Sequence, residues 1–352
     1  MKEGFPLVKT DLKSLDLAEM EQLMTQLGEP RYRGRQVCQW VLQKGVASFA
    51  EMTNLSKDLR GKLAEVARIG NLEIMAKQVS QRDGTTKYLF GMADGQAVES
   101  VLMIHKYGVS ACVSSQVGCR MACRFCASTL GGLVRDLTAG EIYDQVLVME
   151  RDSGRRVDSV VIMGSGEPLE NYDQTLKFIR LIIAPYGLNI GARHITLSTS
   201  GVVPRIYDLA GEGLPITLSV SLHAPNDEIR DQLMPVNKKF PIGELITACR
   251  EYISITKRRV TFEYALMAGI NDNPRQAEEL ARLIRGLLCY VNLIPVNPVA
   301  ERGLAKPEQS AIRRFQQVLK DAGVEATVRR ELGSDIDAAC GQLRRRVLQE
   351  NK

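Results

Sequence analysis

The spacing of apolar residues changes twice along the chain and divides it into regions of different expected structure. Between residues 17 and 67, apolar side chains stand three or four positions apart, which indicates short helices. Asp16 is a candidate N-cap for the first helix, because Glu19 follows three residues later. The sequence Gly28-Glu29-Pro30 ends that helix. We therefore expect a small helical accessory domain over residues 1–80.

Residues 86–115 have the pattern of strands. Apolar runs at 88–90 and 98–104 flank Asp94-Gly95, a turn-forming pair, and predict a β-hairpin. We take residues 81–111 as a hairpin segment that carries Glu99. Glu99 stands in an otherwise apolar strand, where an alternating surface position would explain it as well as a functional one.

Strands and helices alternate through the remainder, residues 112–352. Strands are predicted at 159–163, 194–198, 216–223, 260–266 and 290–294, and helices near 139–150, 172–183, 242–254, 274–287 and 308–322. Thr138 and Glu141 form a capping box before the first of these helices. Repeated strand–helix units predict a parallel sheet of the α/β class. About six units fit an open (β/α)6 barrel, a partial TIM barrel, in which chemistry gathers at the C-terminal ends of the strands.

Polar residues stand at four of these predicted strand ends. Glycine there lets the backbone approach a ligand, and a carboxylate suits an ammonium group. A histidine at such a place is as often a hydrogen-bonded core residue as a ligand contact. The residues at these ends are Gly166 and Glu167, then Ser198, then Ser221, Leu222 and His223, and finally Asn297.

Composition limits the classes of function. With 45% hydrophobic and 25% charged residues among 352, the chain is an ordinary globular protein with a large core. No signal peptide or bilayer-spanning apolar run is visible, so we expect a cytoplasmic protein. The net charge of +5 permits a polyanionic partner without requiring one. In such a compartment, eight cysteines favour thiols, metal sites or catalysis over disulfides.

Three of the cysteines, Cys119, Cys123 and Cys126, form the pattern C-x3-C-x2-C. Three thiolates at this spacing can hold a 4Fe-4S cluster, which usually takes four cysteines. No fourth cysteine follows nearby, so one iron would keep a position open for a substrate, as an open zinc site does for water. A zinc knuckle or three unrelated core cysteines are the alternatives. Zinc sites normally use paired C-x2-C or His ligands, and the run contains no histidine.

Nearly the whole chain resembles the RlmN/Cfr family of radical S-adenosylmethionine RNA adenine methyltransferases. Pro295 and Ala224 are typical of the RlmN branch, because Cfr has arginine and serine at these places. Ser165 stands where the family often has methionine, and Glu331-Leu332 interrupts a stretch that is usually more basic. Blocks that carry the resemblance include Cys112-Val-Ser-Ser-Gln-Val-Gly-Cys119, Ser221-Leu-His-Ala-Pro-Asn-Asp227 and Asp335-Ile-Asp-Ala-Ala-Cys340-Gly-Gln-Leu343.

The resemblance implies a role for each candidate residue. Cys119, Cys123 and Cys126 would bind one 4Fe-4S cluster, and the seven strand-end residues above would contact S-adenosylmethionine. Cys340 would take a methyl group from one S-adenosylmethionine. A second, cleaved at the cluster, would supply the radical that activates this methyl group for addition to C2 of adenine. Glu99 would accept the C2 proton, and Cys112 would release the product by forming a transient disulfide with Cys340.

The implied substrates are adenosine 2503 of 23S rRNA and adenosine 37 of tRNAs. The family also implies a flavodoxin-type electron donor, and we expect a monomer without a membrane partner. The basic run Arg31-Tyr-Arg-Gly-Arg35 in the helical domain is a candidate RNA contact. An adenine-C8 methyltransferase of the Cfr type is the alternative enzyme. A non-catalytic iron–sulfur or zinc RNA-binding protein is the alternative from another class.

Overall fold

The N-terminal part of the chain is helical, as its apolar spacing predicts. The computed structural model describes residues 9–297, 303–336 and 343. Asp16 Oδ1 accepts a hydrogen bond from the Glu19 main chain at 2.8 Å, and the Glu19 carboxylate accepts one from Asp16 N at 2.8 Å. The predicted capping box is therefore confirmed. The elements of this part are β1 (Thr10–Asp11), α1 (Leu17–Gln26), α2 (Tyr32–Cys38), a π-helical turn (Gln39–Gln43), α3 (Lys57–Val66) and β2 (Ala67–Arg68).

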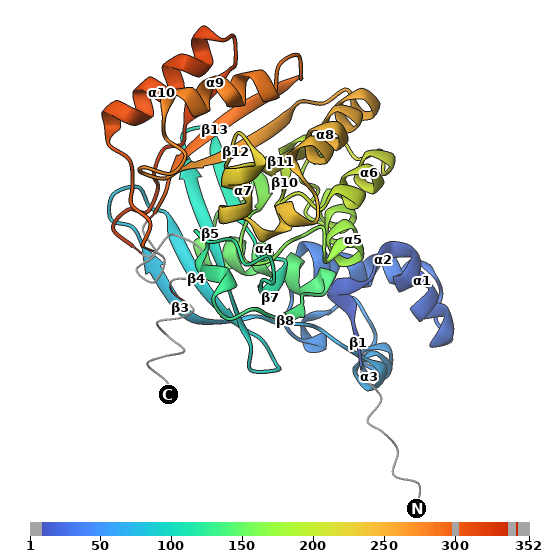
Figure 1. Cartoon of the computed structure of the whole chain (residues 1–352). Coiled ribbons are helices and arrows are strands. Elements are labelled where there is room, and N and C mark those ends of the chain that lie inside the picture. Colours follow the sequence, from blue (N-terminus) through green and yellow to red (C-terminus); the bar gives the residue numbers. More distant parts are fainter. Residues whose placement is uncertain (1–8, 298–302, 337–342, 344–352) are drawn as a thin grey trace, which may run out of the picture.

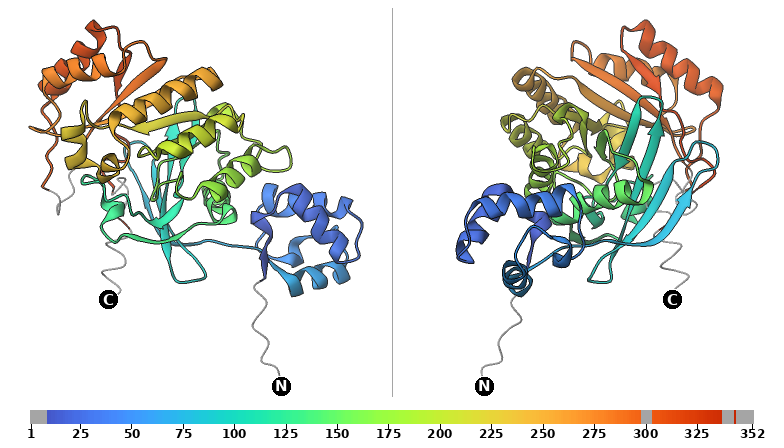
Figure 2. Two further views of the ribbon diagram at one scale, coloured as in Figure 1. Left: turned by 45° about the vertical axis from the view of Figure 1, so that its right-hand side comes forward. Right: turned by 180° about the vertical axis from the view of Figure 1, so that it is seen from behind.

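This helical domain lies against α4 (Ala139–Ser153), at one side of the molecule (Figure 2). Buried polar contacts join the two parts. Lys13 forms a buried ion pair with Asp144 of α4, and Leu72 N donates to the same carboxylate at 2.7 Å. The hydroxyl of Tyr143 donates to Leu42 O at 2.9 Å. Since polar groups that are buried need partners, these contacts specify one arrangement of the two parts.

One ten-stranded sheet organises the rest of the described chain, in the order β14-β13-β12-β11-β10-β9-β6-β5-β4-β3. The strands from β6 to β14 in this order are parallel, whereas β5, β4 and β3 extend the sheet as antiparallel neighbours. The antiparallel strands are β3 (Glu73–Val79), β4 (Thr86–Gly91) and β5 (Ala97–His105). The parallel strands are β6 (Gly108–Cys112), β9 (Ser159–Ile162), β10 (Ile195–Thr199), β11 (Thr217–Ser221), β12 (Val260–Leu266), β13 (Cys289–Pro295) and β14 (Ala326–Val328).

Helices follow the parallel strands and cover the outside of the curved sheet (Figure 1). Within the described residues, six strand–helix units run from β6 and α4 to β13 and α10, and β14 ends the series. This confirms the open (β/α)6 barrel. The remaining helices are α5 (Tyr172–Ile183), α6 (Val203–Gly211), α7 (Asp227–Leu233), α8 (Ile242–Thr256), α9 (Pro274–Leu283) and α10 (Gln309–Asp321). A short hairpin, β7 (Gln116–Gly118) and β8 (Leu133–Asp136), lies between β6 and α4.

The two faces of the parallel sheet differ in chemistry. The face beneath the helices is apolar and buried, with residues such as Leu197, Val220 and Phe262. The inner face is polar. Ser198 of β10 and Ser219 of β11 lie in register on this face, and along the next strands successive side chains alternate between the two faces in the same way. Its further members include Ser221, Glu263 and Asn292, which share one level of the sheet. The barrel interior therefore has the character of a site for a polar ligand rather than a filled apolar core.

Candidate active site

The three cysteines of the C-x3-C-x2-C pattern share the loop between β7 and a short 3-10 turn at Ala127–Thr129. Cys119 and Cys123 are 6% and 7% exposed, and Cys126 is partly exposed. All three are free thiols. The spacing alone predicted a shared loop, and the structure brings the three residues to the mouth of the barrel, beside the strand ends.

Main-chain hydrogen bonds hold this cysteine loop in place. Cys119 N donates to Gly132 O at 2.9 Å, and Arg124 N donates to Leu233 O, at the end of α7, at 2.8 Å. The hydroxyl of Thr129 donates to Cys126 O at 2.9 Å. The loop is thus tied both to its own hairpin and to the helix that follows β11.

The loop has the donor set that an iron–sulfur cluster requires. Burial raises the pKa of the Cys119 thiol to about 12 and raises that of Cys123 as well, and each also feels the charge that Cys126 would carry. As they stand, no three His, Cys, Asp or Glu side chains within the described residues are arranged to hold a metal ion. Binding of a cluster would displace the thiol protons, because thiolates are the ligands. Cys123 and Cys126 also pack in an apolar cluster with Met234, Met267 and Leu304, and this water-poor setting with three thiols in one loop fits such a group.

Glu167, in the loop that follows β9, is a buried carboxylate at the barrel mouth. One oxygen accepts from Ser200 N at 2.7 Å and the other from Leu169 N at 3.0 Å. Burial raises the pKa of Glu167. The ion pairs among the described residues do not include this carboxylate. It can therefore still accept hydrogen bonds from an ammonium group, since a carboxylate has about four acceptor positions.

Gly166, beside Glu167, is required by the packing of the chain on itself. Its φ is +112°, and a Cβ there would lie 2.6 Å from Ser115 Oγ and 2.7 Å from Gln116 N. Ser115 N and Gln116 N both donate to Ser165 O, at 2.9 and 3.1 Å. The sequence suggested that glycine lets a ligand approach. The close contact present here is with residues 115–116, which lead into the cysteine loop.

His223 follows β11 and is a neutral, buried histidine. Its Nδ1 accepts from Ala265 N at 2.8 Å, so the proton of the neutral ring lies on Nε2. Burial lowers the pKa of His223 to about 3. The ring packs edge-on against Phe125 of the cysteine loop, with centroids 4.6 Å apart. His223 therefore connects the end of β11 with the cysteine loop.

The backbone of His223 is strained, with φ +55°, a conformation that costs a residue other than glycine about 1–2 kcal/mol. Asn271 stabilises it, because its amide donates to His223 O at 2.7 Å and to Ala265 O at 2.7 Å. Strain of this kind, held by surrounding hydrogen bonds, is concentrated at functional sites.

The other strand-end residues lie at the same end of the barrel. Ser198 in β10 and Ser221 in β11 are partly exposed on the inner face. Leu222 is fully buried, and its main chain donates to Glu263 O at 3.0 Å. Asn297, two residues beyond β13, is exposed. The fold thus brings together strand ends that are about a hundred residues apart in the sequence.

Arg230 of α7 also belongs to this site, and sequence reasoning missed it. Its side chain is 0% exposed, and its Nη2 donates to Ser200 O at 2.6 Å and to Ser221 O at 3.1 Å. Its Nε donates to Leu222 O at 3.1 Å. Burial lowers the pKa of Arg230 to about 10. This one guanidinium ties the ends of β10 and β11 together.

Replacing Arg230 with methionine is expected to destabilise the protein by roughly 3 kcal/mol or more, because several buried carbonyl groups would lose their donor. Chemical denaturation measures the change. Arg31→Met is the matched control, because the Arg31 side chain is 74% exposed and its ion pair with Glu21 contributes less than about 1 kcal/mol. Equal stability of the two variants would contradict the role of Arg230.

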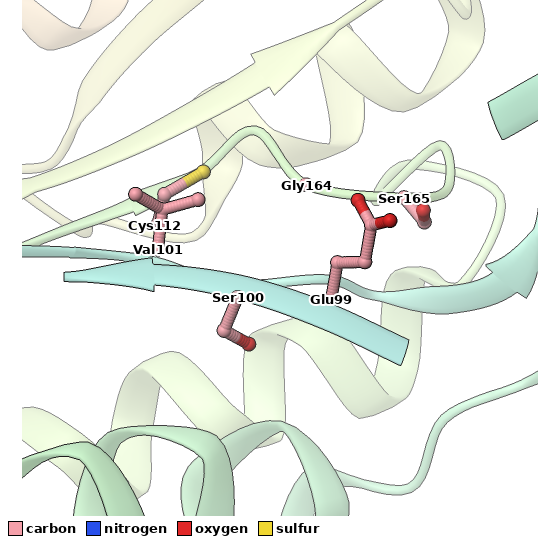
Figure 3. Close-up of a pocket in the computed structure, with 6 residues that line it drawn as sticks. All are labelled: Glu99, Ser100, Val101, Cys112, Gly164 and Ser165. Atoms are coloured by element: carbon pink, nitrogen blue, oxygen red, sulfur yellow. The ribbon is translucent and has the colours of Figure 1, made fainter. Parts of the chain in front are cut away.

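A second group of candidate residues lies on β5 and β6. Glu99 and Cys112 rise from the same side of these two strands, whereas Ser100 points to the other side (Figure 3). They line a small pocket with Gly164 and Ser165, which belong to the loop that carries Glu167. Burial raises the pKa of the Cys112 thiol. The predicted proton acceptor and resolving thiol are therefore neighbours, next to the Glu167 loop.

Cys340 lies outside the described residues, but described residues stand on both sides of it in the sequence. Asp335 accepts from Ser80 Oγ at 2.6 Å and from Gln81 N at 2.9 Å, in the turn before β4. Leu343 is buried in one apolar cluster with Leu89 and Ala97, which lie on β4 and β5. The described C-terminal residues thus contact the antiparallel part of the sheet, where Glu99 lies.

An open (β/α)6 barrel with a three-cysteine loop and polar strand ends at its mouth defines a radical S-adenosylmethionine enzyme. Comparison with known families agrees: residues 113–284 match the radical SAM superfamily, and residues 10–69 match the ribosomal RNA large subunit methyltransferase N-terminal domain. A crystal structure of a radical SAM methyltransferase from Sphaerobacter thermophilus is similar, with a TM-score of 0.91 and 48% identity over 95% of this chain and 98% of that one.

Comparison with curated relatives identifies the family within this class of enzymes. The chain is 60% identical to the "Probable dual-specificity RNA methyltransferase RlmN" of Pelotomaculum thermopropionicum, over 98% of this chain and 95% of the relative. It is 58% identical to the protein of the same description from Alkaliphilus oremlandii, over 97% of this chain and 99% of that relative. The chain therefore belongs to the RlmN family of radical S-adenosylmethionine RNA methyltransferases. Among helices of the described residues, none has the length and apolar character needed to cross a bilayer.

Proposed function

We propose that this protein methylates C2 of adenosine 2503 in 23S rRNA and of adenosine 37 in tRNAs. Membership of the RlmN family supports RNA as the substrate. The observation that carries the chemistry is the position of Glu99 and Cys112 on neighbouring strands beside the Glu167 loop. A carboxylate that removes a proton and a thiol that breaks a carbon–sulfur bond are both needed when a base carbon is methylated through a covalent intermediate.

In this proposal, Cys119, Cys123 and Cys126 hold one 4Fe-4S cluster. Glu167 accepts hydrogen bonds from the amino group of S-adenosylmethionine, because its buried carboxylate at the barrel mouth can accept more hydrogen bonds than the two it has. Together the cluster and S-adenosylmethionine supply a carbon radical, which C2 requires because it has no lone pair with which to attack a methyl cation. The remaining contacts to S-adenosylmethionine are assigned to Gly166, Ser198, Ser221, Leu222, His223 and Asn297.

The residues of the chain then carry out three tasks. Cys340 holds the methyl group that is transferred. After its carbon has bonded to C2, Glu99 accepts the proton that leaves C2, and the unpaired electron left by the radical addition would pass back to the oxidised cluster. Cys112 attacks the sulfur of Cys340, so that a disulfide forms while the bond from that sulfur to the methylene carbon breaks. The carbon keeps the electron pair of this bond and takes up one proton, which completes the new methyl group. Two equivalents of S-adenosylmethionine are used in each turnover.

The length of chain between Cys340 and Leu343 supports this pairing. Leu343 is packed against Leu89 and Ala97, and Leu89 is the cross-strand partner of Glu99. Three residues of extended chain span at most about 10 Å. We propose that this short connection lets Cys340 reach the face of the sheet on which the proposed proton acceptor lies.

The other parts of the proposal concern partners. RNA contacts the N-terminal helical domain, residues 1–80, where the Arg31 side chain is largely exposed. The hairpin segment 81–111 supplies Glu99, and the barrel, residues 112–352, supplies the remaining groups. We further propose that the enzyme works as a cytoplasmic monomer and receives electrons from a flavodoxin-type donor.

Nucleoside analysis by mass spectrometry tests the proposed function. Reconstituted protein is incubated anaerobically with S-adenosylmethionine, a reductant and either a 23S rRNA fragment or tRNA. We expect 2-methyladenosine in both RNAs, and none with Cys340→Ala. Formation of 8-methyladenosine would instead identify a Cfr-type enzyme, and the absence of any methyladenosine would favour a non-catalytic RNA-binding protein.

A further inference from the structure

Lys87 is a buried lysine that lies beside the carboxylate of Glu99. It lies on β4, its side chain is 0% exposed, and its Nζ is 2.9 Å from Oε2 of Glu99, which is 4% exposed. Lys87 is in register with Val101 and Leu89 with Glu99, so Lys87 and Glu99 are diagonal neighbours on one face of the β4–β5 pair. The ammonium therefore lies beside Glu99, which lines a pocket together with Cys112.

Stability is a weak reason for such a pair. Removing two charges from water costs about as much as their attraction returns, and apolar residues of the same size are often as stable. The effect of the Lys87 ammonium on the charge of Glu99 is more direct. Burial disfavours an ionised carboxylate, whereas a cation within about 4–6 Å favours it. A group that accepts a proton in a reaction must first be ionised.

We propose that Lys87 is the positioning residue of the proton acceptor: its ammonium keeps Glu99 ionised and directs the carboxylate into the pocket beside Cys112. This inference rests on the role of Glu99 in the proposed function. The charged groups that act on the Cys112 thiol of this pocket include Lys87 on β4, Glu99 on β5 and Arg329 after β14. Lys87 is the one in ion-pair contact with Glu99.

Lys87→Met tests this inference, since methionine has similar length and no charge. The covalent protein–RNA intermediate and 2-methyladenosine are measured after a single turnover between about pH 6 and pH 9. At about pH 7 we expect product formation at least about tenfold slower than in the parent protein, because without the lysine no more than about one carboxyl group in ten would be ionised. The deficit should shrink as the pH rises, because the unpaired carboxyl group then ionises. Lys87→Arg retains the charge and should restore most of the activity.

Among the described residues, a second buried lysine–carboxylate pair, Lys13 and Asp144, offers a matched control, because it lies at the domain interface away from the pocket. Lys13→Met should destabilise the protein without changing the shape of the pH profile. If Lys87→Met slows the reaction by the same factor at every pH, or does not slow it at all, the inference is wrong.

Two further variants separate this inference from the proposed function. If Glu99→Gln reacts normally while Lys87 is present, Glu99 is not the proton acceptor, and the proposed function fails at that residue. The double variant Lys87→Met/Glu99→Gln removes both charges, and so it also covers the case in which Lys87→Met does not fold. Because Lys87 acts through Glu99, the double variant should react as slowly as Glu99→Gln alone. An additional, pH-dependent loss would mean that Lys87 acts on Cys112 and would overturn the inference.

Discussion

Alanine at any one of Cys119, Cys123 and Cys126 is expected to abolish reductive cleavage of S-adenosylmethionine. Three cysteine thiolates already leave the cluster one protein ligand short of the usual four, so two would not hold it. The cysteine loop contacts the strand ends through Phe125 and His223, and loss of the cluster would therefore also disturb the proposed binding pocket. Iron and sulfide content per chain and the yield of 5′-deoxyadenosine measure the two effects.

Cys249→Ala is the control for this experiment, because Cys249 is a buried free thiol on α8, outside the cysteine loop. It should bind iron normally and lose only the stability expected from a small cavity. Full cleavage of S-adenosylmethionine by a variant with alanine at all three positions would show that the loop does not hold the cluster.

Alanine at Cys112 is expected to stop the reaction after the RNA is joined to the protein. In the proposed mechanism, Cys340 acts before the bond to RNA forms, and Cys112 acts only afterwards. The variant should therefore accumulate RNA that is covalently attached through a methylene group. A denaturing gel of the reaction with substrate RNA should show a slowly migrating band that disappears after protease treatment.

Two controls define this result. The double variant Cys112→Ala/Cys340→Ala should give no band, because the attachment point is missing. Cys289→Ala, which changes a free and partly buried thiol at the start of β13, should release product normally. If Cys112→Ala itself releases 2-methyladenosine at the normal rate, Cys112 is a core thiol, and the proposed mechanism of release is wrong.

Hydrophobic periodicity predicted most of the elements because their apolar stripes are strong. The predicted strand 260–266 coincides with β12, and the predicted helix 172–183 coincides with α5. The helix α6 was missed although Val203, Ile206 and Leu209 are buried at helical spacing. Two other missed elements have weak patterns. α7 is a seven-residue helix with four charged residues, and β3 is an edge strand in which most side chains are exposed. Neither buries enough apolar surface on one face to show a clear period.

The residues of the candidate site also differ in whether the sequence could identify them. Spacing identified the cysteine loop, because three ligands for one cluster must lie close together in a short segment. The resemblance to a known family supplied Glu99, Cys112 and Cys340. Lys87 and Arg230 were found by neither route, because a charged residue in a sequence is normally exposed and its burial depends on distant parts of the chain.

The sequence by itself determined most of the elements, the alternation of strand and helix, the cysteine loop and the family to which the chain belongs. These features depend on residues that are near one another in the chain. Only the tertiary structure decided that β3, β4 and β5 extend the barrel sheet as antiparallel strands, and that Arg230 joins two strand ends. It also decided that Lys87 is paired with Glu99 in a buried position. These outcomes depend on which remote segments exclude water from a given side chain, and no local pattern of residues encodes that.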